Sequence, residues 1–298
     1  MAKRALSVST DDPCDALADV SADEFAAART TLSLRPESTL RVCTWNIWFD
    51  RQDMSERLIL LVRQMLREAP DYVGLQEVTS HVENALRGSA ALLELYDISP
   101  LPVERYGCLI LARRSLGATF DEVELPTMMG RSLLIARSAG FTFATVHLES
   151  LNNAPTRRAQ LEVAAQALAS HGDANQVLCG DFNFDSVQEW GDWRTSRSRT
   201  AAELENSCLG VLLPRFTDAW AALHPDERGI TFDGACNPYV REPREIMRYD
   251  RVLVSGAELV GATLLGVLHT KPHWSTREAM TPSDHYGVIV DLRLAGAQ

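Results

Sequence analysis

The sequence has almost no lysine, no closely spaced pair of cysteines and no long apolar segment. Lys3 and Lys271 are the only lysines, so arginine supplies nearly all the positive charge. The six cysteines are scattered without a C-x-x-C pair, which argues against a disulfide framework or a zinc site and indicates a reduced intracellular protein, cytoplasmic or nuclear. No run approaches the roughly 20 apolar residues of a membrane span. No apolar segment follows Met1 either, so we expect neither stable membrane association nor a secretory signal.

The charge balance is acidic, with 29 basic against 40 acidic residues and a formal net charge of -11 over 298 residues. A protein that coats nucleic acid needs clustered positive charge, so this balance argues against that class but allows an enzyme that meets nucleic acid at one end. We expect a loosely attached arm, flexible or partly helical, over residues 1–39. Its helix would span 21–31, with Ser21 and Glu24 as a capping box. Residues 40–298 would form one catalytic domain.

From Leu40 onward, short β-type runs alternate with helical patterns. The predicted strands are 41–48, 72–78, 107–113, 132–137, 141–148, 176–179, 250–254, 259–266 and 287–294. The predicted helices are 55–68, 82–95 and 156–171. Several strands are apolar throughout, which is typical of strands buried on both faces. The pattern predicts an α/β (α+β) fold with two packed sheets and helices outside.

Polar residues stand at one end of six of these strands. They are Asn46, Gln76 and Glu77, His147, Glu149 and Ser150, Asp181, Asn183 and Asp185, Asp250, and Asp284 with His285. Each has an ordinary explanation by itself, such as a turn for Asn46 or a charge pair with Arg251 for Asp250. Polar groups at strand ends can converge on one rim of a sheet, where α/β proteins place their sites. The whole set therefore predicts an active site.

This set contains the groups needed to hydrolyse a phosphoester with a hard metal ion. Mg²⁺ prefers oxygen ligands, often one or two carboxylates with water and substrate phosphate, and Glu77 and Asp284 can supply the carboxylates. Asp181 fits the base that activates water. Three side chains can donate hydrogen bonds to charge that develops on the phosphoryl oxygens, namely Asn183, His147 and His285. Asp250 is a natural carboxylate partner to orient His285.

The series TWN, LQE, HLES, GDFN, YDR and SDH resembles the endonuclease/exonuclease/phosphatase superfamily over roughly residues 40–294. Within it, the sequence is most similar to the type-2 tyrosyl-DNA phosphodiesterases. TWNIWFD resembles their TWNIDGL-type opening, and MMGRSLL with HLES resembles their MMRNLL and HLES. The resemblance implies a deoxyribonuclease-like, four-layer α/β sandwich and a Mg²⁺ site that Mn²⁺ can also fill. It also implies in-line attack of water on a 5′-phosphotyrosyl bond of DNA, which is a DNA repair reaction.

The resemblance assigns roles to individual residues. Glu77 would bind the metal ion, with Asn46 and Asp284 beside it, either directly or through water. Asp181 would activate water, and Asn183 would help to hold water and phosphate. The residues in contact with the phosphate would be His147, Ser150 and His285, with Asp250 orienting His285. The sequence departs from the family where Leu151 and Asn152 follow HLES, and where Phe232 stands in place of an expected tryptophan.

Three further residues are predicted to contact the substrate: Arg131, Phe232 and Trp193. Arg131 lies in the best-matched segment, and Phe232 retains a ring that can stack. Trp193 belongs to a long loop, 186–214, that follows GDFN and contains Trp190 and the run RTSRSRT. This loop either grips a nucleic-acid strand by charge and stacking or is mobile and neutral.

We therefore predict a metal-dependent phosphoric diester hydrolase that acts as a monomer on a 5′-phosphotyrosyl DNA adduct or another nucleic acid end. The same chemistry on abasic-site DNA, RNA or a small phosphoester stays open, as does an inactive binding protein on the same fold. The acidic net charge favours a small or end-bound substrate over a long duplex, because a duplex offers many phosphates that need neutralising.

Overall fold

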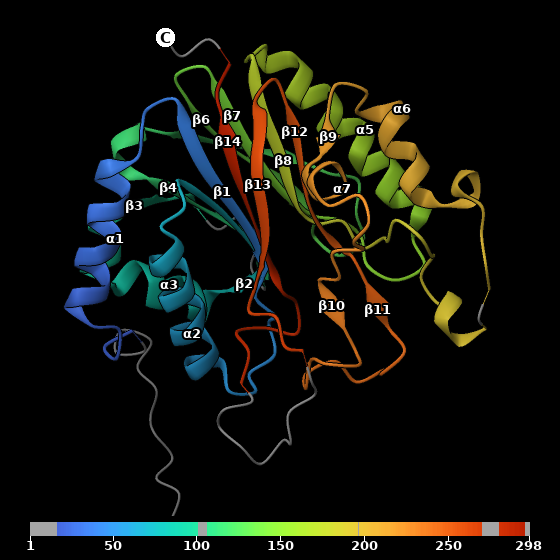
Figure 1. The fold of residues 1–298 in the computed structure, drawn as a ribbon, viewed down its shortest axis with the longest axis horizontal. Coiled ribbons are helices and arrows are strands. Elements are labelled where there is room, and N and C mark those ends of the chain that lie inside the picture. The colour runs from blue at the N-terminus through green and yellow to red at the C-terminus, as the bar shows by residue number, and fades with distance from the viewer. Residues whose placement is uncertain (1–16, 101–105, 196, 270–279, 296–298) are drawn as a thin grey trace, which may run out of the picture.

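Two six-stranded mixed sheets pack face to face in the computed structural model, which describes residues 17–100, 106–195, 197–269 and 280–295 (Figure 1). The first sheet contains, in spatial order, β13 (Glu258–Leu265), β14 (Gly287–Arg293), β1 (Thr39–Asn46), β2 (Tyr72–Thr79), β4 (Tyr106–Arg113) and β3 (Tyr96–Ile98). The second contains β5 (Thr119–Glu124), β6 (Ser132–Ser138), β7 (Phe141–His147), β8 (Asn175–Asp181), β12 (Asp250–Ser255) and β9 (Thr217–Asp218). A separate ribbon consists of β10 (Phe232–Asp233) and β11 (Ile246–Met247).

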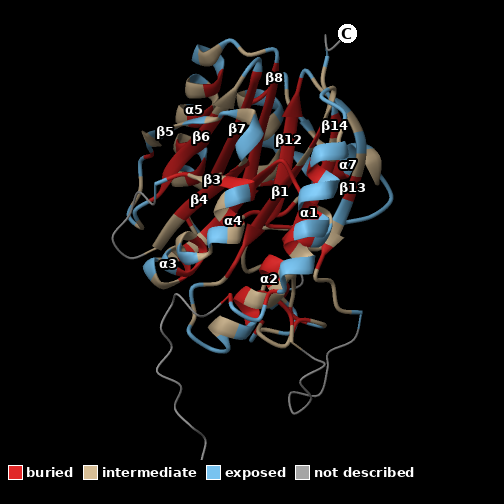
Figure 2. Ribbon diagram, turned by 90° about the vertical axis from the view of Figure 1, so that its left-hand side faces the viewer, coloured by how far each residue is buried: buried red, intermediate tan, exposed pale blue. Residues whose placement is uncertain are grey.

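Helices cover the outer face of each sheet. The first sheet carries α1 (Ala22–Leu34), α2 (Met54–Glu68), α3 (Ser80–Gly88) and α4 (Ala90–Leu95). The second carries α5 (Ala154–His171) and α6 (Cys208–Leu212), and the short α7 (Ala219–Leu223) packs near β12 and β13. Figure 2 shows the buried strands in the middle, with the helices turning exposed faces outward. The predicted four-layer α/β sandwich is confirmed.

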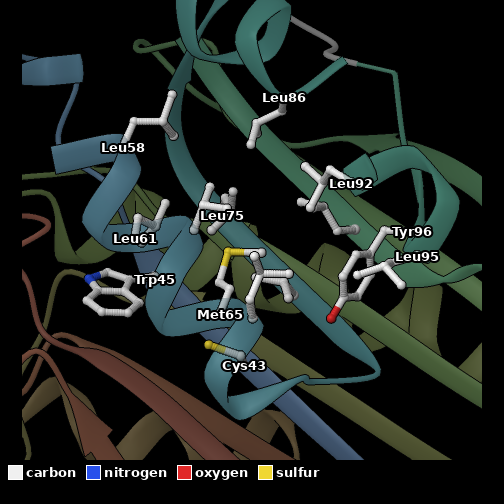
Figure 3. Packing of buried hydrophobic residues seen from close by; sticks show 14 of the residues in the cluster. Cys43, Trp45, Leu58, Leu61, Met65, Leu75, Leu86, Leu92, Leu95 and Tyr96 are labelled. Atoms are coloured by element: carbon white, nitrogen blue, oxygen red, sulfur yellow. The ribbon is translucent and has the colours of Figure 1, made fainter. Parts of the chain in front are cut away.

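Three apolar layers hold this arrangement together. Side chains such as Val42, Tyr72 and Phe143 fill the space between the sheets. Beneath α2, its apolar stripe packs on the outer face of the first sheet (Figure 3), where the buried residues include Trp45, Leu58, Leu61, Met65 and Leu75. A third cluster joins α5 to the second sheet. Each layer removes apolar surface from water, which is the main favourable term in folding, and so fixes the strand ends that carry the site.

The nine predicted strands are present, with their ends shifted by at most two residues. The predicted helix at 82–95 is wrong as one helix, because Ser89 has an extended backbone and its side chain caps α4. The exposed edge strand β5 was not predicted, since TFDEVE buries little and lacks a clear apolar face. Among the described residues, no helix is long and apolar enough to cross a lipid bilayer.

The N-terminal helix α1 begins with the predicted capping box, in which Ser21 and Glu24 bond each other's backbone. Its residues Phe25, Ala28 and Leu32 are buried against the first sheet's helices. Part of the arm is therefore a packed helix, and the flexible or partly helical arm over 1–39 stays a prediction. The first sixteen residues lie outside the described part, and the domain boundary at 39/40 stays a prediction.

Candidate active site

The predicted site residues come together at one end of the sandwich, although they belong to two sheets. In the first sheet, β1 runs parallel to β2 and antiparallel to β14, so Asn46 and Glu77 lie near the start of β14. In the second, β8 runs parallel to β7 and antiparallel to β12, which places Asp181 between His147 and Asp250 in register. The directions of the strands thus bring polar residues that are far apart in sequence into one cluster.

Asp181 is the centre of this cluster. Its Oδ2 accepts a hydrogen bond from Asn46 Nδ2 at 2.9 Å, and its Oδ1 accepts one from the Asn183 backbone at 2.9 Å. The same Oδ2 lies 3.4 Å from His147 Nε2 and 3.9 Å from His285 Nε2. Burial acts to raise the pKa of Asp181, but the two histidines and these hydrogen bonds outweigh it, so the pKa is lowered. Asp181 is therefore an ionised carboxylate.

The two histidines beside Asp181 are held in different charge states. His285 Nδ1 lies 2.7 Å from Asp250 Oδ2. Burial acts against its charged form, yet Asp250, Asp181 and Asp284 together raise its pKa well above the ordinary value. His147 has no such partner on Nδ1 within the described part of the chain, and burial with the nearby Arg131 lowers its pKa to about 3. The site thus contains one cationic and one neutral imidazole, and both can donate from Nε2 toward Asp181.

Glu77 and Asp284 form a pair of carboxylates beside this centre. Glu77 stands at a β-bulge with φ of 62°, and its Oε2 accepts the Phe49 N–H at 3.0 Å. Burial raises the pKa of Glu77, and burial with the charge of Glu77 raises the pKa of Asp284 to about 7. Buried carboxylates whose ionisation is disfavoured by burial and by a neighbouring carboxylate are a natural place for a cation.

The donor set around these carboxylates fits Mg²⁺. No group of three His, Cys, Asp or Glu side chains forms a metal cage within the described residues. Mg²⁺ does not require such a cage, because it commonly takes one or two carboxylates and completes its shell with water and substrate phosphate. A pair of carboxylate oxygens without a thiol or paired histidine ligands favours a hard ion over zinc.

The backbone at the site is held in uncommon conformations. Trp48, Glu77 and Asn183 all have positive φ, at 59°, 62° and 57° respectively. Such conformations cost about 1–3 kcal/mol each for residues other than glycine, and persist when the surroundings fix them. Asn183 is fixed by its Nδ2, which donates to the Leu148 carbonyl at 3.0 Å. Glu77 and Asn183 thus belong to the site itself, whereas the Trp48 ring lies against Arg57 and Tyr239.

Arg131 and Ser150 lie together next to His147. Arg131 Nη2 donates to Ser150 Oγ at 3.1 Å, and its guanidinium lies 5.4 Å from the centre of the Tyr106 ring. The Tyr106 ring centre in turn lies 6.5 Å from that of His147. The loop that carries Arg131 is anchored because Glu149 accepts from the Thr127 hydroxyl at 2.7 Å. Glu149 therefore has a structural partner, although it belongs to the same polar series.

The structure separates the two predicted aromatic contacts. Phe232 packs edge-on against His285, with ring centres 4.9 Å apart, so it borders the site. Trp193 is only 7% exposed and lies in a small buried cluster with Met247 and Tyr249. Its contact with the substrate stays a prediction, but the ring has little free surface on which a base could stack.

The long loop after β8 is held by its own arginines. Arg199 makes two hydrogen bonds to Asp192, at 2.5 and 2.8 Å, and Arg194 lies over the Trp190 ring. Arg197 has Glu203 as its nearest acidic partner, at 4.0 Å. The charge of Arg199 is therefore paired within the loop, whereas Arg194 and Arg197 have no acidic partner at hydrogen-bond distance among the described residues, and the two alternatives for the loop stay open.

The family model described as the endonuclease/exonuclease/phosphatase family matches residues 43–285. The chain belongs to this family. Its structure is similar to that of D. rerio TDP2 complexed with single-strand DNA product, with a TM-score of 0.68 and 24% identity over 86% of this chain and 99% of that one. Truncated C. elegans TDP2 gives a TM-score of 0.66 and 24% identity over 86% of this chain and 97% of that one. The human Nocturnin catalytic domain gives a TM-score of 0.59 and 19% identity over 87% of this chain and 94% of that one. A comparison with curated proteins finds no match. The resemblance inferred from the motifs is confirmed.

Two buried arginines hold loops beside the site, and neither was predicted from the sequence. Arg57, in the first turn of α2, is 1% exposed and donates to the carbonyls of the loop after β1. The acceptors are Ile47, Trp48, Asp50 and Gln52, together with Pro282 from the loop before β14. Its guanidinium also lies 4.7 Å from the centre of the Trp48 ring.

Arg157 has the equivalent place in α5 and holds the loop after β7. It donates to the carbonyls of Glu149 and Leu151 at 2.8 and 2.7 Å. It also makes a bidentate ion pair with Glu205, at 2.8 and 2.7 Å, in which the two side chains are 1% and 6% exposed. The one signal in the sequence is that each arginine shares the apolar stripe of its helix, four residues before Leu61 or Leu161.

Proposed function

We propose that this protein is a Mg²⁺-dependent phosphodiesterase that hydrolyses a 5′-phosphotyrosyl DNA adduct by in-line attack of water. The observation that carries the proposal is the arrangement around Asp181. An ionised carboxylate faces a cationic His285, a neutral His147 and the Asn46 amide, next to the Glu77–Asp284 pair. Family membership supports hydrolysis of a phosphoester as the reaction class.

The side chains divide the chemistry of hydrolysis among them. Asp181 accepts the proton of the attacking water, and Asn46 and Asn183 fix the orientation of that carboxylate. His285, kept charged by Asp250, donates to an oxygen on which negative charge develops. His147 donates from a neutral ring, and Ser150 with Arg131 provides further donors on the same side.

Glu77 and Asp284 would hold the metal ion, with Asn46 close by, and Mn²⁺ would substitute for Mg²⁺. When bound, the ion would polarise a phosphoryl oxygen and offset the charge of the phosphate and of the carboxylates. Without a cation, the acidic cluster repels a phosphodiester, because Asp181, Glu77 and Asp284 are all carboxyl groups. We therefore expect substrate affinity as well as turnover to depend on the ion.

The choice of substrate rests on the HLES and MMGRSLL segments and on charge. The D. rerio TDP2 structure contains a single-strand DNA product. In this chain, Arg131 and Phe232 stand on either side of the histidines and would contact the strand end and its adduct. The net charge of -11 and the pairing of Arg199 with Asp192 support few phosphate contacts, as at an end. We place the active enzyme inside the cell, as a monomer.

Cleavage of a 5′-phosphotyrosyl oligonucleotide tests this proposal. The protein should release tyrosine in Mg²⁺, and this release should stop in EDTA. Glu77→Gln should lower kcat/KM by roughly a hundredfold or more, because loss of one group that stabilises transition-state charge costs about 10²–10³. Glu122→Gln, an exposed glutamate on β5, is the matched control and should be unaffected. Cleavage that persists in EDTA would overturn the mechanism.

A second candidate keeps the chemistry and changes the phosphoester. A panel of abasic-site DNA, RNA and small phosphoesters, assayed beside the phosphotyrosyl oligonucleotide, separates the two by their kcat/KM values. Higher activity on another member overturns the substrate but not the reaction. An inactive protein on this fold would show no cleavage of any member, and Asp181→Asn would then change nothing.

A further inference from the structure

An exposed phenyl ring stands beside the proposed site without a role in it. Phe49, in the loop after β1, is 46% exposed. Its ring stacks on Tyr106, with centres 5.0 Å apart and planes at 19°. Its backbone N–H donates to Glu77 Oε2 at 3.0 Å, so the ring is fixed next to a carboxylate proposed to hold the metal ion. Glycine stands at this position in the TWNIDGL opening that TWNIWFD resembles.

The loop that presents Phe49 is unusually well fixed. Arg57 donates to carbonyls on both sides of it, including Trp48 and Asp50. Trp48, the residue before Phe49, adopts the left-handed region with φ of 59°. A buried cation and a strained residue are both costly. Holding an exposed apolar ring by such means is not explained by stability, because burial of that ring would be more favourable.

A cavity adjoins the ring. It measures about 660 Å³, and Phe49, Arg51, Ser80 and His81 are among its lining residues. That volume is within the ~300–1,000 Å³ of small-molecule sites. Polar groups that surround one exposed ring provide both a stacking face and hydrogen-bond partners, which is the combination that binds a planar aromatic group.

We propose that Phe49 is a stacking platform for a planar aromatic ring of the substrate, with the adjoining cavity as its subsite. The inference rests on the proposed function in one respect, since it takes the reacting phosphoester to lie at Glu77. The substrate ring that stacks on Phe49 belongs either to the terminal nucleobase or to the phenol on the other side of the phosphate. The chemistry of recognition is the same in both cases.

Binding in Mg²⁺ tests the platform without requiring turnover when every protein, including the one with unchanged Phe49, also carries Asp181→Asn, which removes the proposed base. The probe is a single-stranded oligonucleotide with a 5′-phosphotyrosine and 2-aminopurine as its first base, followed by fluorescence anisotropy. Phe49→Leu and Phe49→Ala should weaken binding roughly tenfold, as expected for the loss of a stacked base. Phe49→Trp should bind as tightly as the unchanged protein. Val260→Ala, which removes an exposed apolar side chain of β13, is the control and should have no effect.

Two ring-free probes identify the source of the ring. One has an abasic first nucleotide, and the other has a propyl ester in place of the phenol. The probe that lacks the stacked ring should bind the unchanged protein about tenfold more weakly and show no further loss with Phe49→Leu. Equal binding of all Phe49 variants, an undiminished Phe49→Leu effect on both ring-free probes, or no binding by the unchanged protein would overturn the platform.

The two proposals fail in different ways. If the unchanged protein binds the probe through Phe49 but does not cleave it in Mg²⁺, the proposed function is wrong and the platform stands. If cleavage is normal and Phe49→Leu and Phe49→Ala have the same kcat/KM as the unchanged protein, the platform alone is wrong.

Discussion

The two halves of the site are supported by equivalent arginines with different partners. Arg57 follows β1 and binds backbone carbonyls only, without an ion pair among the described residues. Arg157 follows β7, binds two carbonyls and adds a buried bidentate pair with Glu205. Each guanidinium replaces the water that the polar backbone of an irregular loop would otherwise need. The same solution thus appears once in each sheet.

The difference shows which parts of the molecule each half depends on. Arg57 joins the loop after β1 to Pro282, so it links two segments that carry proposed metal ligands. Arg157 joins the loop after β7 to Glu205, which belongs to the long loop after β8. The first half is therefore tied to the metal site, whereas the second is tied to a distant loop through charge. Three experiments separate these dependencies.

Arg157→Met should have the largest effect on stability. It leaves Glu205 buried without its partner, and such a loss costs about 3–5 kcal/mol of the free energy of unfolding. Urea denaturation measures the change. The double substitution Arg157→Met with Glu205→Leu should recover most of the loss, because an apolar pair replaces a buried ion pair at little cost. A double variant no more stable than the single one contradicts this account of the second half.

Arg57→Met should affect stability less and metal binding more. It removes a buried cation along with its bonds, so the free energy of unfolding should fall by only about 1–3 kcal/mol. The Mg²⁺ concentration for half-maximal thermal stabilisation should rise roughly 10- to 100-fold, as for other groups that position metal ligands. Arg67→Met, an exposed arginine on the same helix, is the matched control. An unchanged Mg²⁺ midpoint in Arg57→Met would break the proposed link to the metal site.

Acid should weaken the second half selectively, with the smallest effect. Asp218 binds Arg248 and Arg251, at 2.8 and 3.0 Å, and Arg251 also holds the Phe184 carbonyl after β8. Burial opposes ionisation of Asp218, but the two arginines outweigh it and lower its pKa below 3.8. A lowered carboxylate pKa stabilises the folded state above the unfolded value, and this stability is lost as pH falls through the folded pKa.

The Asp218 contribution is therefore complete at pH 5 and declines from about pH 4 downward. The melting temperature of the unchanged protein should fall more between pH 5 and pH 3 than that of Asp218→Asn, although Asp218→Asn starts lower. Circular dichroism measures both. Parallel curves for the two proteins would show that Asp218 does not contribute to the acid response. Arg57, bound to carbonyls, should provide no corresponding acid-sensitive step.

Much of this architecture was predictable because its signals are local. The capping box at Ser21 and Glu24 needs only four consecutive residues, and an apolar strand followed by a polar residue can be recognised without knowing its neighbours. The separation of α3 from α4 was missed, since the apolar pattern continues through Ser89. Trp193 was predicted to contact the substrate, and its burial depends on Met247 and Tyr249, which are more than fifty residues away in sequence.

Arg57 and Arg157 show most clearly what the sequence alone does not predict. An arginine near the start of a helix is ordinarily solvated. Its burial here requires a curved loop that turns several carbonyls toward one point, and that curve exists only after the sheets have packed. Their position on an apolar stripe was the available signal, but the same spacing also fits an arginine that lays its stem along the surface.

The sequence by itself determined nine of the strands, the main helices and the inventory of the proposed site: a set of carboxylates, two histidines and two asparagines at strand ends. These depend on the order of residues along the chain. The tertiary structure decided that Asp181 stands between a charged and a neutral histidine, that the charge of Glu77 acts on Asp284, and that Phe49 is exposed. Burial and the proximity of other charges set those properties, and both arise only when segments distant in sequence meet.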